Sequence, residues 1–314
     1  MALGDSIALS PLLRDLKAQY PEIQLGVSCA GGDELYRHDS DLVALKADQP
    51  GVEVFRAYYR NAYKASQSGV PLFFSQGFFV TFNNESGLGV KCLDPKPHLV
   101  LTEEEKAVSP LPFRYWLINA GGKQDMLVKI WPARRYQQVV DQTRREINWV
   151  QIGLKHDSRF PHLHPELTGV TSLVGQTSIR DLMRLVYHSD GVLCPVTAVM
   201  LIAQAFEKPC VVVAGGREEW WWQAYCHENP ALSEWRHLIR VPHRYLHSIG
   251  KFDCCEKVGC HCCSIVAPHN DSKFPDGFFC QRPCFDPGGV PVGECLWKLS
   301  PEEVVAAVRS YKTL

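Results

Sequence analysis

The stretch SDGVLCPVTAVMLIAQAFEKPCVVVAGG, residues 189–216, decides the fold class. Residues 191–194 form a short apolar run that predicts a buried strand, and residues 199–206 predict a helix. Residues 210–214 predict a second apolar strand, which ends in a glycine pair. A strand, a helix and another strand within so short a stretch are typical of parallel pairing. We therefore predict an α/β fold with a doubly wound, mostly parallel sheet.

The same alternation continues on both sides of this stretch. Ser178 and Asp181 have the spacing of a capping box, which predicts where one helix begins. Ser300, followed by proline and two acids, predicts the start of the last helix. The further strands are predicted at 113–120 and 148–153, and the further helices at 132–144, 178–189 and 301–311.

The first third of the chain gives weaker signals. Leucine and isoleucine at helical spacing predict a helix that begins near residue 7 and is ended by Pro21. We further predict a strand at 23–28, an aromatic-rich helix at 52–66, and loops with short strands at 80–100. The proline-rich segment at 99–112 looks like a linker, so the predicted domains are residues 1–108 and 109–314.

Composition excludes several classes of protein. The 314 residues are 46% hydrophobic and 21% charged, with a net charge of -1, which fits two globular domains and gives no reason to expect nucleic acid. No apolar run reaches the roughly 18–20 residues that a membrane helix needs, and the N-terminus lacks the pattern of a signal peptide. We expect a cytoplasmic protein that is not inserted in a membrane.

Cysteines are concentrated near the C-terminus, because eight of the 13 lie between Cys254 and Cys295. In a reducing compartment disulfides explain such a cluster poorly, whereas four thiolates around zinc or iron would fold a loop-rich span. Free thiols are the alternative. A closed four-cysteine site leaves no open position, so the predicted metal is structural and no catalytic metal is expected.

Several segments resemble one family when they are taken in order. The segments are residues 3–11 with Gly4-Asp5, 115–123, Lys129-Ile130-Trp131-Pro132, 173–182 with Gly175-Gln176-Thr177-Ser178, 189–209, and 242–250. Together they resemble glycosyltransferase family 9, the heptosyltransferases, and the cysteines after residue 250 resemble those of a bacterial and phage subgroup.

The resemblance implies a glycosyltransferase B fold, in which two Rossmann-like domains with parallel sheets face each other across a cleft. It also implies a nucleotide-sugar donor, ADP-heptose, held by the C-terminal domain. The acceptor, a glycan or a protein, would face the N-terminal domain, and a homo-oligomer is compatible with this scheme.

Glycosyl transfer needs a base for the acceptor hydroxyl and positive charge for the leaving diphosphate. By the resemblance, Asp5 is the candidate base, although an aspartate at this place also suits a helix N-terminus. Lys129 is the candidate for neutralising the diphosphate, and Lys123 is a second candidate.

The remaining donor candidates follow predicted strands. A strand, a tight turn and a helix bring free N–H groups to one point, where Thr197 would bind phosphate. After the last predicted strand, two glycines would let the backbone approach a ligand, with Arg217 binding phosphate and Glu218 a hydroxyl; a plain turn is the alternative. The donor-binding candidates are Lys129, Lys123, Thr197, Thr177, Gly215, Gly216, Arg217 and Glu218.

Two features depart from the family pattern. Pro195-Val196-Thr197 replaces an Asp-Thr-Gly, and Leu201 stands where the family has histidine. The alternative functions are therefore a catalytically degenerate relative that binds nucleotide or glycan, and a metal-dependent interaction protein.

The subgroup pattern assigns the metal to Cys255, Cys260, Cys280 and Cys295, with Cys254, Cys263 and Cys284 as substitutes. We interpret Trp220-Trp221-Trp222 as packing residues, the floor of a sugar or adenine site being the alternative.

Overall fold

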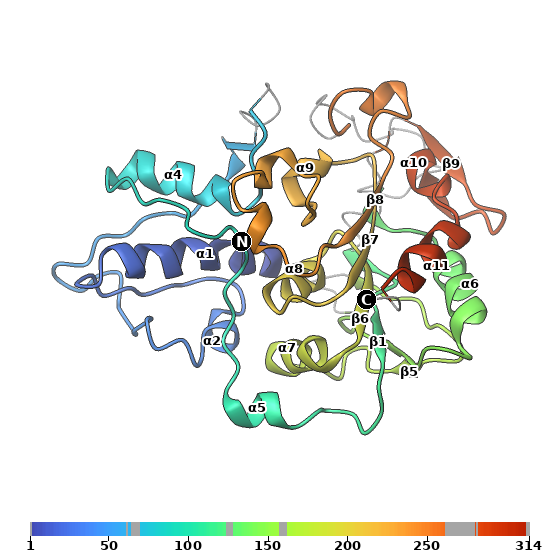
Figure 1. The fold of residues 1–314 in the computed structure, drawn as a ribbon, viewed down its shortest axis with the longest axis horizontal. Helices are drawn as coiled ribbons and strands as arrows, with labels where there is room; N and C mark the ends of the chain where they lie inside the picture. The colour runs from blue at the N-terminus through green and yellow to red at the C-terminus, as the bar shows by residue number, and fades with distance from the viewer. Residues whose placement is uncertain are drawn as a thin grey trace.

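The computed structural model describes residues 2–60, 62–63, 70–123, 128–156, 162–260, 280 and 282–311. In Figure 1 the first helices lie on the left and a sheet lies on the right, with the cysteine-rich segments above it. Among the described residues, no helix has the length and apolar character that crossing a membrane requires.

A six-stranded parallel sheet forms the centre of the second half, in the order β5-β3-β1-β6-β7-β8. Its strands are β1 (Trp116–Ile118), β3 (Trp149–Gln151), β5 (Thr171–Ser172), β6 (Gly191–Pro195), β7 (Cys210–Gly215) and β8 (Arg244–His247). The chain moves outward from β1 in one direction and from β6 in the other. The switch point of this doubly wound sheet therefore lies between β1 and β6, where ligands bind outside the carboxyl ends of the strands.

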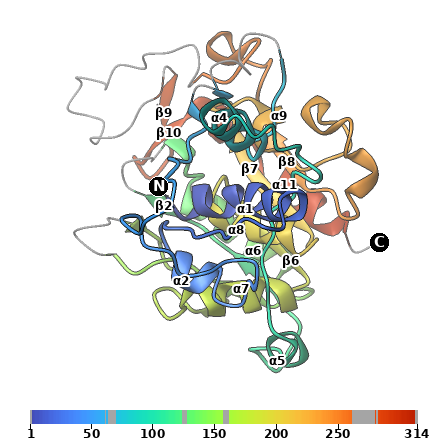
Figure 2. The same ribbon diagram turned by 90° about the vertical axis from the view of Figure 1, so that its left-hand side faces the viewer.

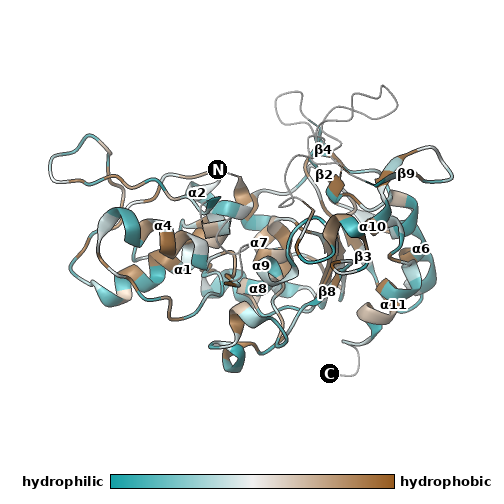
Figure 3. Cartoon of the chain, turned by 90° about the horizontal axis from the view of Figure 1, so that it is seen from above, coloured by the Kyte–Doolittle hydropathy of each residue, from teal (hydrophilic) through white to brown (hydrophobic). Residues whose placement is uncertain are grey.

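Helices cover both faces of this sheet. Alternate residues of the strands, such as Leu117 and Val192, join the core on the side of α7 (Ile179–His188) and α8 (Ala198–Ala205). Their neighbours join a second core, with α6 (Ala133–Thr143) and α11 (Pro301–Arg309). Figure 3 shows α6 mostly teal on its outer side and the strands near β3 and β8 mostly brown. The predicted parallel α/β class is confirmed, as are the helices capped by Ser178 and Ser300.

Small elements complete this half. Two antiparallel pairs join β2 (Gly122–Lys123) to β4 (His162–Leu163) and β9 (Pro283–Phe285) to β10 (Pro291–Gly293). The remaining helical turns are α9 (Trp220–Gln223), α10 (Glu294–Trp297), η2 (Pro230–Leu232), η3 (Arg236–Leu238) and η4 (Asp253–Cys255).

The first 112 residues contain helices and irregular chain, namely α1 (Leu3–Gln19), α2 (Gly32–Leu35), α4 (Gln76–Ser86) and α5 (Glu103–Ala107). Helix α1 packs against both α8 and α4, and α2 packs against α7; Figure 2 shows these helices from the N-terminal side. The core under α7 and α8 continues without a break into α1, since it includes Ile7 and Leu12. The N-terminal helices thus rest on α7 and α8, the helices that cover one face of the sheet.

Three predictions for this part are wrong. The strand expected at 23–28 is reduced to one parallel bridge between Leu25 and Leu42, because the other residues of that run stay at least partly exposed. A second sheet is therefore not formed among the described residues of this part. Of the helix expected at 52–66, residues 52–59 are not helical, residues 60 and 62–63 are helical, and 61 and 64–66 lie outside the described residues. Of the loop region expected at 80–100, residues 80–86 instead belong to α4, which Gly87 ends in the left-handed conformation (φ 72°).

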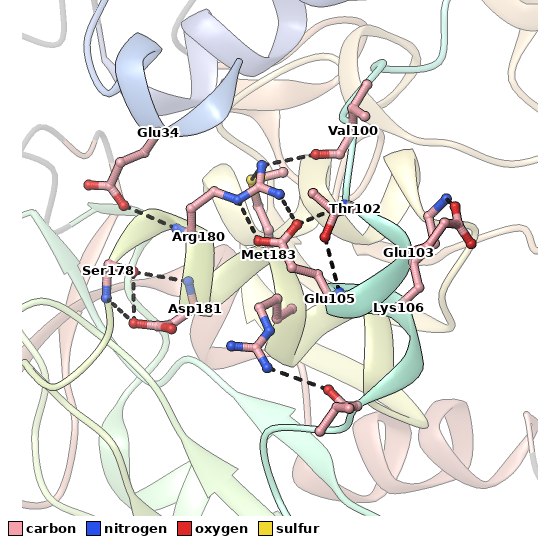
Figure 4. A network of polar contacts seen from close by, with 12 residues as sticks. Glu34, Val100, Thr102, Glu103, Glu105, Lys106, Ser178, Arg180, Asp181 and Met183 are labelled. Carbon is pink, nitrogen blue, oxygen red and sulfur yellow. Dashed lines mark hydrogen bonds and ion pairs between the residues drawn. The ribbon is translucent and has the colours of Figure 1, made fainter. Parts of the chain in front are cut away.

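An ion pair ties α5 to α7 (Figure 4). The buried Arg180 donates from Nε to Glu105 Oε1 at 3.0 Å and from Nη1 to the carbonyl of Val100 at 2.9 Å, and it makes a second contact with Glu105. Its backbone N–H donates to Glu34 Oε2 at 3.2 Å, so α2 joins the same network. These contacts fix the N-terminus of α7 against the N-terminal part.

Candidate active site

The first turns of α1 and α8 meet at the carboxyl end of β6. A Cβ on Gly4 would lie 3.8 Å from Ala198 Cα and 3.7 Å from the side chain of Leu201, at ordinary van der Waals distance, so the two helix starts are in direct contact. Asp5 directly follows Gly4 in the sequence, and Thr197 directly precedes Ala198. The predicted base and the predicted phosphate-binding turn therefore lie next to each other, beside the switch point of the sheet.

Asp5 is the third residue of α1 and is half-buried. Its Oδ2 accepts the backbone N–H of Ala2 at 2.9 Å, so the aspartate does serve its own helix, as the alternative interpretation expected. Burial, and next the negative charge of Asp5, raise the pKa of the Tyr59 hydroxyl. The charge of Asp5 also acts on Lys129, which places the two predicted groups in one electrostatic cluster.

Lys129 and Arg217 converge on a single carboxylate. Lys129 Nζ lies 2.9 Å from Glu218 Oε1, and Arg217 Nη1 contacts the same oxygen. The other oxygen, Oε2, accepts from Gln223 Nε2 at 2.6 Å. Burial lowers the pKa of Lys129, while the negative charges of Glu218 and Asp5 act in the opposite direction. Two cations held around one oxygen form a site that suits an anion with several oxygens.

Thr197 precedes α8 as its N-cap, with an extended backbone (φ -142°, ψ 174°). Its Oγ1 is buried, and no group of the described residues hydrogen-bonds to it. The first N–H groups of a helix also lack partners inside the helix, and they carry partial positive charge. This turn therefore offers a hydroxyl and backbone N–H groups to an anion.

Two further predicted donor residues, Thr177 and Lys123, lie near the starts of other elements. Thr177 directly precedes Ser178, the N-cap of α7. The first residue of that helix, Ile179, lies within 2.4 Å of a Cβ built on Gly31, and Gly31 also lies next to Leu3 of α1. Lys123 is exposed on β2, opposite His162 of β4, and no described contact joins it to Asp5 or Lys129.

Gly215 and Gly216 approach the cysteines. Gly215 has φ +67° where β7 bulges, and a Cβ on Gly216 would lie 2.8 Å from Cys255 Sγ and 3.6 Å from Cys295 Cβ. The N–H of Cys260 donates to the carbonyl of Gly216 at 2.9 Å. The turn that carries Arg217 and Glu218 is thus packed against the cysteine cluster.

The thiols of this cluster lie near one another. Cys255, Cys260 and Cys280 are buried, and Cys280 Sγ and Cys295 Sγ both lie within 3.5 Å of a Cβ built on Gly293. Burial raises the pKa of Cys255 to about 12 and those of Cys280 and Cys295 to about 11 each. Within the described part of the chain, however, no three His, Cys, Asp or Glu side chains are arranged to hold a metal ion. Cys254 and Cys284 are described, and Cys263 lies outside the described residues.

A cavity of about 420 Å³ opens beyond the carboxyl ends of β1 and β3 and is lined by Leu154, Lys155, His156, His162, Leu163, His164 and Val174. The ring of His164 lies against Gly121 and Gly153, where a Cβ would come within 2.7 Å and 2.4 Å of its Nδ1. Burial lowers the pKa of His164 to about 4, so its ring is neutral near pH 7. The rings of His162 and His164 are stacked at 5.7 Å.

Two residues of the cluster are missing from the sequence predictions. Tyr59 lies in a stretch without regular structure, and Gln223 follows the three tryptophans. Trp222 itself is buried among Tyr59, Tyr63 and Phe74, which confirms its interpretation as a packing residue. Only the contacts between distant segments identify Tyr59, so no local pattern could have found it.

Solved structures with the same fold place the molecule in a class. A glycosyltransferase family 9 protein from Veillonella parvula is 12% identical, with 99% of this chain and 94% of that chain covered at a TM-score of 0.58. E. coli ADP-heptose lps heptosyltransferase II is also 12% identical, with coverage of 98% and 95% at a TM-score of 0.52. TibC, an iron-containing dodecameric glycosyltransferase from enterotoxigenic E. coli, is 12% identical, with 100% and 74% covered at 0.59. The fold is that of glycosyltransferases of the B type.

The family follows from the sequence itself. The model of glycosyltransferase family 9 (heptosyltransferase) matches residues 64–237, which is more than half of the chain. This chain belongs to that family and is a glycosyltransferase. A search of curated proteins finds no match.

Proposed function

We propose that this chain transfers heptose from ADP-heptose to a hydroxyl group of a glycan or protein acceptor. The observation that carries the proposal is that Asp5, on the turn of α1 that packs on the first turn of α8, acts electrostatically on Lys129, which shares the Glu218 carboxylate with Arg217. A base and an anion site within one cluster are the two requirements of this reaction. In this proposal residues 1–108 face the acceptor and residues 109–314 bind the donor.

In the proposed reaction, the acceptor oxygen attacks the anomeric carbon and gives its proton to Asp5. The bond from that carbon to the diphosphate oxygen breaks, and its electron pair leaves with ADP. Lys129 and Arg217 exchange the Glu218 carboxylate for diphosphate oxygens, and the N–H groups and hydroxyl at Thr197 bind the same group. The Glu218 carboxylate, which Gln223 holds through Oε2, would then accept hydrogen bonds from sugar or ribose hydroxyls.

The cavity next to β1 and β3 suits the nucleoside part of the donor. Its position outside the carboxyl ends of parallel strands is where this fold binds nucleotides. Leu154 and Val174 supply apolar walls, and neutral His164 has both ring nitrogens buried without a partner among the described residues. A base or ribose would give these nitrogens hydrogen bonds that they otherwise lack.

We also propose that Cys255, Cys260, Cys280 and Cys295 hold a structural zinc or iron ion. Their soft sulfur ligands fit either metal, and a bound cation would favour the thiolates that burial alone disfavours. The comparison with TibC supports this proposal, because that protein is iron-containing. TibC is also dodecameric, which supports a homo-oligomer for this chain.

Release of ADP from ADP-heptose, with water or added glycan as acceptor, tests the transfer. We expect Asp5→Asn to lower kcat by about 10²–10⁴-fold, the usual contribution of a positioned base, and to change ADP affinity little. Asp33→Asn is the matched control, because Asp33 is an exposed carboxylate in the first turn of another helix, α2.

Two results would contradict the proposal. Tight ADP-heptose binding without turnover by the unaltered protein would favour the degenerate relative, whose signature is Leu201, a buried residue packed on Gly4. Full activity of Asp5→Asn would show that another group accepts the proton.

A further inference from the structure

The turn at residues 215–218 follows β7 and leads the chain into the candidate site. Its first two carbonyl groups are bonded to chain that follows β8. The N–H of Ser248 donates to the carbonyl of Gly215, and the N–H of Cys260 donates to the carbonyl of Gly216, both at 2.9 Å. The backbone at the start of the turn is therefore fixed by two residues that are distant in the sequence.

Gly259 lies against the second half of this turn. A Cβ built on Gly259 would lie 2.5 Å from the carbonyl oxygen of Arg217, and 2.5 Å and 2.6 Å from the carbonyl carbon and Cα of Glu218. Non-bonded heavy atoms rest about 3.5–4.0 Å apart, and these three are backbone atoms that cannot rotate aside. Gly259 is also buried, so the two backbones pack this closely only because it has no side chain.

The side chains on this turn depend on where its backbone lies. Arg217 and Glu218 are each only 11% exposed, and Arg217 Nη1 contacts Glu218 Oε1. The same oxygen lies 2.9 Å from Lys129 Nζ, which comes from the segment before α6, and Glu218 Oε2 accepts from Gln223 Nε2 at 2.6 Å. If the backbone of the turn moved by about 1 Å, these groups would no longer converge on one point.

We infer that Gly259 is a positioning residue of the donor site, whose bare backbone supports the turn that carries Arg217 and Glu218. This inference rests on the proposed function, because the site that Gly259 supports is the proposed diphosphate site. Gly259 touches no part of the donor and acts only through the turn. The segment between Cys255 and Cys260 thereby takes part in recognising the diphosphate.

Gly259→Ala tests the inference. We expect the dissociation constant of ADP, measured by isothermal titration calorimetry, to rise by about 10- to 100-fold, the usual effect of losing a hydrogen bond to a charged group. Adenosine lacks the diphosphate and should bind equally well to the variant and the unaltered protein, because other residues line its proposed cavity. Gly288→Ala is the matched control and should change neither affinity. Gly288 is exposed between β9 and β10, where a Cβ would meet only Asp286 Oδ1, at 3.2 Å.

Hydrogen exchange of the unaltered protein tests the same contact without a substitution. If Gly259 and Cys260 hold the turn, a ligand that holds the turn also holds them, because coupling between two sites is reciprocal. ADP should therefore slow exchange in residues 255–260, including the N–H that Cys260 donates to Gly216, and adenosine should not. This measurement decides the question even if Gly259→Ala does not fold.

Three results would overturn the inference. Equal weakening of ADP and adenosine binding by Gly259→Ala would show that Gly259 has a purely structural role. Unchanged ADP affinity of the folded variant, or exchange in residues 255–260 that ADP does not slow, would show that the turn does not depend on Gly259. Failure of the proposed function has a different signature, namely an unaltered protein that binds ADP but releases none from ADP-heptose.

Discussion

The sheet half and the N-terminal part of this enzyme are held together by different means. In the sheet, backbone groups of neighbouring strands bond to each other, as in the four paired positions of β6 and β7. In the N-terminal part, side chains of one helix, α1, bond to the backbone of irregular segments. These bonds join Ser10 to His98, Arg14 to Asp94 and Lys96, Asp15 to Leu93 and Gln19 to Lys91; Tyr20, which directly follows the helix, bonds to Leu88.

The difference shows two ways of satisfying the backbone. A strand ladder pairs the backbone N–H and C=O groups regularly, and the ladder tolerates many different side chains as long as they are apolar. A helix that serves as an anchor satisfies it through particular side chains at particular positions. Damage to the first should therefore follow buried volume, and damage to the second should follow the loss of individual polar groups.

Metal removal gives the largest expected loss of stability, because the described cysteine segments contain only the short β9–β10 ladder and the short helical turns η4 and α10. Structural zinc contributes on the order of 10 kcal/mol to the folding of small metal-dependent modules. We expect a strong chelator, or Cys260→Ser, to remove about one metal ion per chain. Elemental analysis and hydrogen exchange of residues 248–260 and 282–299 provide the measurement.

Cys226→Ser serves as the control, since Cys226 is a half-buried thiol outside the cluster. Protein isolated without chelators that contains neither zinc nor iron would refute the metal proposal.

In the sheet, Leu117→Ala should lower the free energy of unfolding by about 2–5 kcal/mol, the usual cost of emptying a leucine site in a core. Leu117 is fully buried in β1, between β3 and β6. Urea denaturation followed by circular dichroism measures the loss, and Leu154→Ala, at a side chain that is 55% exposed, is the control. A loss below that of the control would mean that buried volume does not decide stability here.

In the N-terminal part, Asp15→Asn should cost about 1–3 kcal/mol, because a buried ionic acceptor becomes neutral. Asp15 is 1% exposed and accepts from the N–H of Leu93 and from Arg14 Nε, both at 2.7 Å. Faster hydrogen exchange at residues 91–96, with β6 and β7 unchanged, is the expected pattern. The exposed Asp48→Asn is the control. Equal loosening of the strands would show that the two parts are not separately held.

The same difference explains what the sequence could predict. Residues 191–195 are all buried, and Ser178 and Ser300 cap their helices with the expected serine-to-acid spacing, so local patterns sufficed there. In the N-terminal part, Val54 and Tyr58 are apolar or aromatic yet largely exposed, and the pattern at 52–66 was misleading. The bond from Asp15 to Leu93 joins residues 78 positions apart, which no local pattern contains.

The predictions for the candidate site show the same difference between residues in local motifs and residues placed by distant contacts. Asp5, Lys129 and Thr197 were predicted because they lie in motifs that resemble the family; Asp5 follows Gly4, which packs on Ala198 next to Thr197, and its charge acts on Lys129. Their roles as base and donor ligands stay predictions. Tyr59 lies in no motif, and its place beside Trp222 and within reach of the charge of Asp5 appears only in the folded chain.

Helix α1 has a mechanical consequence for catalysis. It begins with Asp5 in its first turn, and its later residues hold the segment at 88–98, so one rod of 17 residues connects the two. At 1.5 Å per residue this rod is about 25 Å long. A ligand that tilts the C-terminal end of α1, such as a glycan chain or another subunit bound at residues 88–98, would therefore also displace the carboxylate of Asp5 at the N-terminal end.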